Sequence, residues 1–229
     1  MLDLKGYGWM LWQGLELTIL VGLAAMALAL GLGLLGAWGK LAQGRAGRWA
    51  AGTYTTVIRG VPELLLILLV YYGVPTLIQD IAEGAGHDII LDINPFVAGV
   101  ITIGFIYGAF ATEVFRGAFL AVPRGQIEAA RAAGMGQALT FRRIVLPQMW
   151  RFALPGLGNV WLVLIKATAL ISVIQLEELV RNADIAARAT KLPFTFFFVV
   201  SLFFLGITIV SMVVQRRAEV WANRGVRRA

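Results

Sequence analysis

Five polar side chains follow one another inside an otherwise apolar stretch in the last third of the sequence. They are Lys166, Thr168, Ser172, Gln175 and Glu178. From Thr168 onward the steps are four, three and three, which predicts one face of a single helix. Charged and amide groups are costly in hydrocarbon, so they normally face a cavity, a partner or the path of a polar solute. We therefore predict that these residues line a substrate path.

Glu63 is a further ionisable residue within an apolar stretch. It follows Pro62 at the expected start of a membrane helix. One interpretation is a carboxylate that stabilises the dipole of its own helix, because acidic residues are favoured in the first turn. The other is a carboxylate that faces a polar path through the membrane. The residues alone leave both interpretations open, and we include Glu63 in the predicted substrate path.

A charged segment separates two apolar stretches in the middle of the chain. It reads EAARAAGMGQALTFRRIVLP and runs from Glu128 to Pro147. Residues 126–133 are good helix formers, and Gly134 permits a backbone turn at positive φ. We predict that Pro147 closes a second short helix, because proline rarely continues one.

The same segment has the composition of a docking surface. Small side chains at Ala129 and Ala130 allow another protein to approach closely, while Glu128 and the nearby arginines offer directional contacts. The alternative is an amphipathic loop that lies on lipid headgroups.

The chain as a whole is far more apolar than a soluble domain. Its residues are 59% hydrophobic and 14% charged, whereas about 25% of residues are charged in a typical soluble domain. We predict an all-α integral membrane protein with five transmembrane helices, each of which needs roughly 20 apolar residues. The predicted helices lie near residues 11–38, 60–80, 95–118, 153–175 and 193–214. Residues 1–229 are expected to form one transmembrane domain, with a cytoplasmic loop at about 119–150.

The cations fall mainly on one side of this arrangement. Lysines and arginines cluster between the first two predicted helices, around the Glu128 segment and in the C-terminal tail. The loop from Asp80 to Asp92 has four acids and neither lysine nor arginine. The positive-inside rule then places the N-terminus outside and the C-terminus and the Glu128 segment in the cytoplasm. This topology accounts for the net charge of +7 without a nucleic-acid partner.

Several local sequence patterns that resemble binding sites are explained more simply by helix packing or by a solvated loop. The run GLGLLG from Gly31 to Gly36 satisfies a dinucleotide fingerprint, but it lies in an apolar helix with no preceding strand. Gly104 and Gly108 suit close helix packing, either within the chain or against another subunit. The single histidine, His87, lies in an acidic loop and is not expected to bind a metal. We expect no catalytic, metal or cofactor site within this chain.

The Glu128 segment resembles the EAA loop of the membrane subunits of ATP-binding-cassette (ABC) importers. The matching residues are Glu128, Ala129, Ala130, Gly134, Ile144, Leu146 and Pro147. Longer stretches that begin at Tyr54, Ile93 and Leu154 resemble polar amino-acid permeases, and together they cover most of residues 54–181. Within this group the chain resembles the Q-type permeases of histidine/lysine/arginine/ornithine and opine importers.

This resemblance implies a type I importer permease (MetI-like) fold and roles for the matching residues. The EAA loop is expected to dock into an ATPase as a coupling helix. Glu63 matches an acidic position of importers of cationic amino acids, where a carboxylate can neutralise the substrate cation. The segment from Lys166 matches a Lys-x-Thr-x-Leu-x-Ser run of the family, although Ala169 stands where many members have serine.

The resemblance also implies partners and a location in the bacterial inner membrane. The expected partners are a second, M-type permease or a second copy of this chain, two ATP-binding subunits that hold ATP and Mg, and an extracytoplasmic solute-binding protein. The leading function is uptake of basic amino acids or opines. The alternatives are the same machine for neutral or acidic amino acids, and an autonomous secondary transporter or channel.

Overall fold

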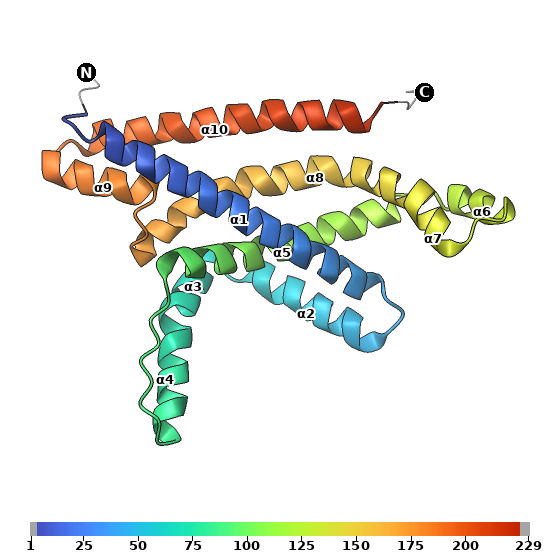
Figure 1. Ribbon diagram of the computed structural model, residues 1–229, viewed down its shortest axis with the longest axis horizontal. Helices are drawn as coiled ribbons and strands as arrows, with labels where there is room; N and C mark the ends of the chain where they lie inside the picture. The colour runs from blue at the N-terminus through green and yellow to red at the C-terminus, as the bar shows by residue number, and fades with distance from the viewer. Residues whose placement is uncertain (1–3, 225–229) are drawn as a thin grey trace.

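The computed structural model describes residues 4–224, which are almost entirely helical and contain no β-strand (Figure 1). The α-helices are α1 (Gly8–Leu41), α2 (Arg45–Gly60), α3 (Glu63–Leu68), α4 (Val74–Gly84), α5 (Pro95–Leu120), α6 (Arg124–Ala132), α7 (Gln137–Thr140), α8 (Leu146–Ala167), α9 (Leu179–Thr190) and α10 (Pro193–Ala222). Two π-helical turns, η1 (Leu69–Gly73) and η2 (Phe141–Val145), and one 3₁₀-helix, η3 (Thr168–Ile174), join some of them.

Five stretches of the described chain are long and apolar enough to cross a membrane, as the sequence predicts. They are Gly8–Leu41, Glu63–Gly84, Pro95–Leu120, Gln137–Ile174 and Pro193–Ala222. The sequence does not predict two further helices, α2 and α9. Each has a polar face with charged residues and an apolar face, so neither stands out in a search for long apolar stretches.

Glycines bring α1 and α5 close together along much of their length. A Cβ atom on Gly33 of α1 would lie 2.6 Å from the Cβ atom of Ala111 on α5. In the other direction, a Cβ atom on Gly104 would lie within 2.9 Å of the Leu28 side chain. Gly104 and Gly108 therefore serve packing within the chain. The GLGLLG run likewise lies inside α1, where Gly33 is a packing position.

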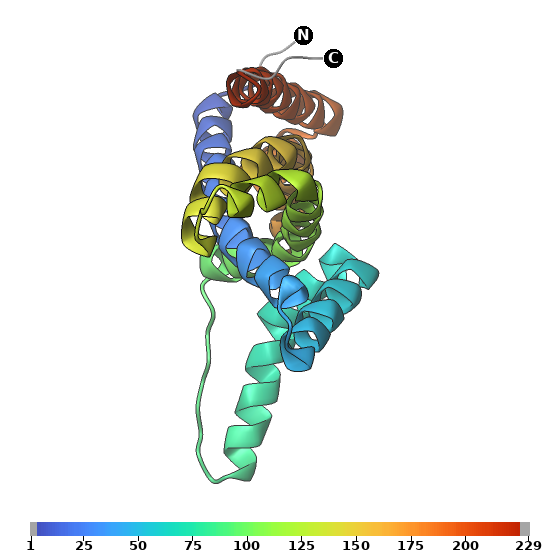
Figure 2. The same cartoon turned by 90° about the vertical axis from the view of Figure 1, so that its right-hand side faces the viewer.

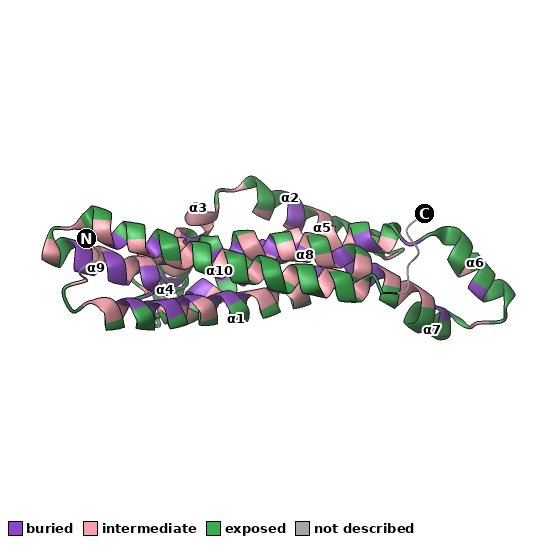
Figure 3. Cartoon of the chain, turned by 90° about the horizontal axis from the view of Figure 1, so that it is seen from above, coloured by how far each residue is buried: buried purple, intermediate pink, exposed green. Residues whose placement is uncertain are grey.

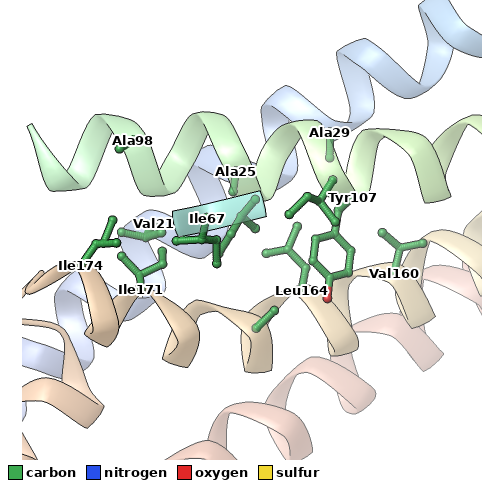
Figure 4. Close-up of a cluster of buried hydrophobic side chains, with 13 residues drawn as sticks. Val21, Ala25, Ala29, Ile67, Ala98, Tyr107, Val160, Leu164, Ile171 and Ile174 are labelled. Atoms are coloured by element: carbon green, nitrogen blue, oxygen red, sulfur yellow. The ribbon is translucent and has the colours of Figure 1, made fainter. Parts of the chain in front are cut away.

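The main hydrophobic core lies where α1, α3, α5, α8 and η3 meet (Figure 4). Ile67 of α3 and Tyr107 of α5 are almost fully buried in it. The other large buried side chains of this cluster are Val21, Ile103, Ile106, Val160, Leu164, Ile171 and Ile174. This core fixes the start of α3, and with it the position of Glu63.

A second cluster fastens α9 between the N-terminal part of α1 and the start of α10. Leu11, Leu179 and Phe196 are completely buried there. Asn182 of α9 donates a hydrogen bond from Nδ2 to the Met10 carbonyl over 2.8 Å. A third cluster, around Phe115, packs the C-terminal end of α5 against the N-terminal end of α8, next to α6.

The helix α4 points away from the bundle, as two perpendicular views show (Figures 1 and 2). The extended connection 85–94 runs back beside it, and Gln79 donates a hydrogen bond from Nε2 to the Leu91 carbonyl over 3.3 Å. Asn94 then begins α5, because its side chain accepts hydrogen bonds from the backbone N–H groups of Phe96 and Val97. Only 17% of the most apolar part of Glu63–Gly84 is buried, so this arm offers a large apolar surface to its surroundings.

Two details of the predicted helices are wrong. The predicted helix 153–175 begins earlier and is not uniform: the α-helix ends at Ala167, η3 follows, and Gln175 is left-handed with φ 65°. Pro147 does not close a helix but lies in the first turn of α8. The π-turn η2 precedes it, with Leu146 N–H bonded to the Phe141 carbonyl five residues back. The widened turn accommodates a proline that lacks an N–H group.

Candidate functional site

The segment predicted to couple to an ATPase forms a helical hairpin at one end of the molecule. Helix α6 ends at Ala132, and Gly134 adopts φ +81°, the left-handed conformation that glycine tolerates best. The N–H groups of Gly134 and Met135 bond the carbonyls of Arg131 and Ala130 over 2.9 and 3.0 Å. These bonds close the helix end in the way typical of a glycine-terminated helix. The predicted helix and turn are therefore both confirmed.

One face of α6 is attached to the bundle and the other is free. Gln148 of α8 donates a hydrogen bond from Nε2 to Gln126 Oε1 over 2.6 Å. Ala130 is buried, whereas Glu128 and Ala129 are exposed. Figure 3 shows α6 as a largely exposed helix at the end of the molecule opposite α9. The hairpin thus exposes small and charged side chains on one face, while the Gln148–Gln126 hydrogen bond holds it to α8.

The remaining residues of the predicted coupling motif lie on the support of this hairpin. Ile144 belongs to η2, and Leu146 and Pro147 begin α8. Ile144 and Leu146 are partly buried, and Leu146 packs against the cluster around Phe115. Ile144 and Leu146 connect the hairpin to α5 and α8, whereas Pro147 is exposed.

Glu63 lies at the first residue of α3 and is partly buried. The hydroxyl group of Tyr107 on α5 donates a hydrogen bond to Glu63 Oε1 over 3.0 Å. No cation lies within ion-pair distance of this carboxylate among the described residues. Tyr107 thus holds one oxygen of the Glu63 carboxyl group in place. Sequence reasoning misses this tyrosine, because no local pattern links positions so far apart.

A polar cavity of about 410 Å³ opens between α1, α2 and α5, close to the start of α3. Its lining includes Lys40, Arg59 and Glu113. Glu113 forms ion pairs with both Lys40 and Arg116, and the Arg116 contact measures 2.9 Å. The guanidinium group of Arg59 lies 5.1 Å from the centroid of the Phe110 ring. The Glu113–Arg116 pair is local in sequence, whereas the contributions of Lys40 and Arg59 depend on tertiary packing.

The four polar residues from Thr168 to Glu178 that are predicted to share a helix face do not do so, and Lys166 lies apart from them on α8. Lys166 lies at the end of α8 with an exposed side chain, and Thr168 is buried, with its hydroxyl bonded to the Ile165 carbonyl over 2.8 Å. Ser172 donates to the Ala169 carbonyl over 2.7 Å. Gln175 is exposed in the bend after η3. Both hydroxyl groups are thus occupied by nearby backbone, and the structure does not gather these residues into one lining.

Glu178 belongs to a different element from the rest of that set. It precedes α9, and its Oε1 accepts a hydrogen bond from the Arg181 N–H over 2.8 Å, as an N-cap does. Its Oε2 accepts from the Thr18 hydroxyl on α1 over 3.3 Å. Burial raises the pKa of this carboxyl to about 7, and the hydrogen bonds from the α9 backbone and Thr18 partly oppose that effect. These contacts indicate an anchor between α9 and α1.

Comparison with known proteins places this architecture in a family. Residues 14–220 match the family described as binding-protein-dependent transport system inner membrane component. The chain belongs to this family. The matched range includes most of the five apolar helices as well as the α6 hairpin.

Full-length relatives within the family are permeases. The chain is 46% identical to the histidine/lysine/arginine/ornithine transport system permease protein HisQ of Salmonella typhimurium, over 96% of this chain and 98% of that protein. It is 47% identical to the nopaline transport system permease protein NocQ of Agrobacterium fabrum, over 97% and 94% of the two chains. These relatives are transport subunits and not enzymes.

Solved structures agree with the fold. An amino acid ABC transporter crystallised with histidines has a chain that superposes with a TM-score of 0.82 at 29% identity, over 96% of this chain and 98% of that chain. The MetNI methionine ABC transporter in an inward-facing conformation matches with a TM-score of 0.66 at 17% identity, over 93% and 94% of the two chains. The expected type I importer permease fold with five membrane helices is thereby confirmed.

Proposed function

We propose that this chain is the permease subunit of an ABC importer that carries basic amino acids or opines into the bacterial cytoplasm. Relatives named for histidine, lysine, arginine, ornithine and opine transport align with it almost end to end, which supports the substrate class. The observation that carries the proposal within the molecule is the partly buried Glu63 carboxylate, held by Tyr107 and without a cationic partner among the described residues.

The proposed role of Glu63 follows from electrostatics in a poorly hydrated path. A carboxylate without a neighbouring cation attracts an ammonium, guanidinium or imidazolium group more strongly there than in water. The hydrogen bond from the Tyr107 hydroxyl group limits rotation of the Glu63 side chain. The side chain therefore loses less conformational entropy when a substrate binds. Lys166, Thr168, Ser172 and Gln175 remain proposed contributors to the path through conformations in which their surroundings open.

The proposed partners follow from the same architecture. The α6 hairpin docks into an ATPase subunit, which binds ATP and Mg and performs the hydrolysis. We assign two such ATPases, a second permease of similar fold and an extracytoplasmic solute-binding protein to the complex. In the proposed orientation the N-terminus is outside, and the α6 hairpin and the C-terminus are in the cytoplasm.

The experiment that tests this function measures uptake by the reconstituted complex with its ATPase and solute-binding protein. Replacement of one charge-assisted contact costs about 1.5–3 kcal/mol, so Glu63→Gln should lower uptake of labelled arginine or lysine by about tenfold or more. Tyr107→Phe should lower it less, because the carboxylate remains. Glu83→Gln is a matched control, since Glu83 is an exposed acid near the end of α4.

A second candidate is the same machine for neutral or acidic amino acids. The cavity lined by Arg59 favours it, because this guanidinium group has no ion-pair partner among the described residues and can bind a carboxylate. Uptake restricted to neutral or acidic amino acids, together with an unchanged rate in Glu63→Gln, would establish this alternative. Uptake that needs no ATP would instead indicate an autonomous transporter and refute both candidates.

A further inference from the structure

The polar cavity between α1, α2 and α5 is lined by two cations that differ in their partners. We call it the α2–α5 cavity; it encloses about 410 Å³, and its lining includes Lys40, Arg59 and Glu113. Lys40 forms an ion pair with Glu113, which also pairs with Arg116 over 2.9 Å. Arg59 has no ion-pair partner among residues 4–224. The cavity therefore has one cation that is free to bind an anion.

Phe110 positions the guanidinium group of Arg59 without using its hydrogen-bond donors. The Cζ atom of Arg59 lies 5.1 Å from the centroid of the Phe110 ring, within the range of a cation–π contact. The Arg59 side chain donates no hydrogen bond within the described part of the chain. Thr56, one turn earlier on α2, also lines the cavity and adds a hydroxyl group. A planar guanidinium group with free N–H donors matches the two oxygens of a carboxylate.

A break between α2 and α3 keeps Arg59 apart from Glu63. The two residues are four positions apart, and on one continuous helix opposite charges at this spacing pair with each other. Here α2 ends at Gly60, Val61 and Pro62 are extended with ψ 137° and 133°, and α3 begins at Glu63. No ion pair joins Arg59 and Glu63. Both charges therefore remain available to a ligand.

Two aromatic residues on successive turns of α5 contact these two charged residues. Tyr107 donates a hydrogen bond to Glu63 Oε1 over 3.0 Å, and its ring centroid lies 5.6 Å from that of Phe110, which contacts Arg59. Tyr107 and Phe110 are three residues apart, which is about 4.5 Å along the helix axis. Glu63 does not line the α2–α5 cavity but closely follows Gly60, which does. A ligand that reaches both charges therefore needs an anionic and a cationic end.

We propose that Arg59 binds the carboxylate of the transported amino acid in the α2–α5 cavity, while Glu63 binds its cationic side chain. This assignment rests on the proposed function and adds the group that recognises the other end of the substrate. A basic amino acid carries its carboxylate and its side-chain cation at opposite ends, as the separated Arg59 and Glu63 require. Since every amino acid has the carboxylate, Arg59 contributes affinity for all of them, whereas Glu63 selects the basic ones.

The headgroup of an anionic lipid is a second source of a single negative charge. Both ligands share the chemistry of an oxyanion bound by a guanidinium group. The Glu63 carboxylate favours the amino acid, because it repels an anion that lacks a cationic end.

The test measures binding to the purified transporter with its ATPases in detergent, without the solute-binding protein, so that only the membrane complex contributes. The probes are labelled arginine and argininamide, in which an uncharged amide replaces the carboxylate. In the parent, arginine should bind about tenfold or more tightly than argininamide, since a charge-assisted contact supplies that factor. In Arg59→Gln, arginine binding should weaken by about the same factor, and argininamide binding should not change. The two ligands should then bind about equally.

Three further variants separate a carboxylate contact from a general loss of structure. Arg45→Gln is the matched control, because it removes an exposed arginine of α2 that does not line the cavity, and it should leave both affinities unchanged. Arg59→Lys keeps the charge without the planar fork and should restore part of the preference for arginine. Glu63→Gln should weaken both ligands alike, because both retain the guanidinium group.

Three results would overturn the assignment of Arg59. Equal binding, or no binding, of the two ligands by a parent that transports arginine would exclude a carboxylate contact. An equal loss of both ligands in Arg59→Gln would make Arg59 a structural residue. Displacement of labelled arginine by added phosphatidylglycerol in the parent but not in Arg59→Gln would assign Arg59 to a lipid headgroup. Each result is compatible with ATP-driven arginine uptake, whereas absence of that uptake in the parent would refute the proposed function itself.

Discussion

Glu178 is the most deeply buried acidic residue among the described residues, and its carboxyl group joins α9 to α1 through hydrogen bonds. Its side chain is 0% exposed and bonds both the start of α9 and Thr18 of α1. The folded protein favours the protonated carboxyl, because burial raises its pKa from 4.5 to about 7. Between these two values the folded state binds more protons than the unfolded state. The contribution of this group to stability is therefore greatest at low pH and falls as pH rises through about 7.

We predict that the apparent Tm of the purified complex falls by several degrees between pH 5 and pH 8 because of this residue. In Glu178→Gln the fall should be much smaller, since the amide can still accept from Arg181 but does not ionise. Tryptophan fluorescence on heating measures the transition. Glu177→Gln is the control, because Glu177 lies beside it and is more exposed. An identical pH dependence in Glu178→Gln and the parent would contradict the assigned protonation.

Gly134 ends the α6 hairpin's first helix in a left-handed conformation, and a substitution there tests the proposed coupling role. A β-branched side chain at φ +81° costs about 1–3 kcal/mol, so Gly134→Val should distort the turn and lower ATP-driven uptake by about tenfold. Gly136→Val is matched to it, because Gly136 has φ −66° and a Cβ atom there would meet no heavy atom within 4 Å. Uptake and ATPase retention during purification should both be measured. Equal activity of the two variants would remove Gly134 from the coupling role.

Among the elements, α1 offers a comparison within a single helix. Gly33 packs against Ala111, whereas a side chain on Gly31 would meet nothing within 4 Å. Gly33→Ala should destabilise the protein by about 1–3 kcal/mol through overpacking. Gly31→Ala should be neutral or stabilise it by about 0.5–1 kcal/mol, because alanine favours the helix. Thermal unfolding of both variants checks the difference, and a loss of stability in Gly31→Ala would indicate that a partner covers that position.

The sequence predicts an element correctly where neighbouring residues determine its structure. It does not predict features that depend on contacts between residues far apart in the chain. The apolar runs identify the five membrane helices, and glycine at position 134 predicts its turn. The break after Ala167 could not be predicted, because hydrophobic periodicity does not distinguish an α-helix from a 3₁₀-helix followed by a bend. Likewise, the Glu63–Tyr107 contact joins residues on separate helices. Only the tertiary packing of α3 against α5 brings them together.

For the whole molecule, the proposed orientation can be tested directly because the sequence contains no cysteine. Single cysteines replacing His87, in the loop after α4, and Ala138, in α7, should lie on opposite sides of the membrane. In right-side-out vesicles an impermeant thiol reagent should label only His87→Cys. Permeabilised vesicles provide the control, since both sites should then react. Labelling of Ala138→Cys in intact vesicles would reverse the proposed topology.

The π-turn η2 has a consequence for how the hairpin and the bundle are aligned. A π-turn holds one more residue than an α-helical turn of the same chain path, and one residue corresponds to about 100° of rotation around an α-helix. Across Phe141–Val145, α7 is therefore rotated relative to α8 by the equivalent of one residue, compared with an uninterrupted α-helix. Deletion of Arg142 would restore a regular helix and turn the hairpin to a different side of the bundle. The angular position of the α6 hairpin relative to α8 thus depends on a single inserted residue.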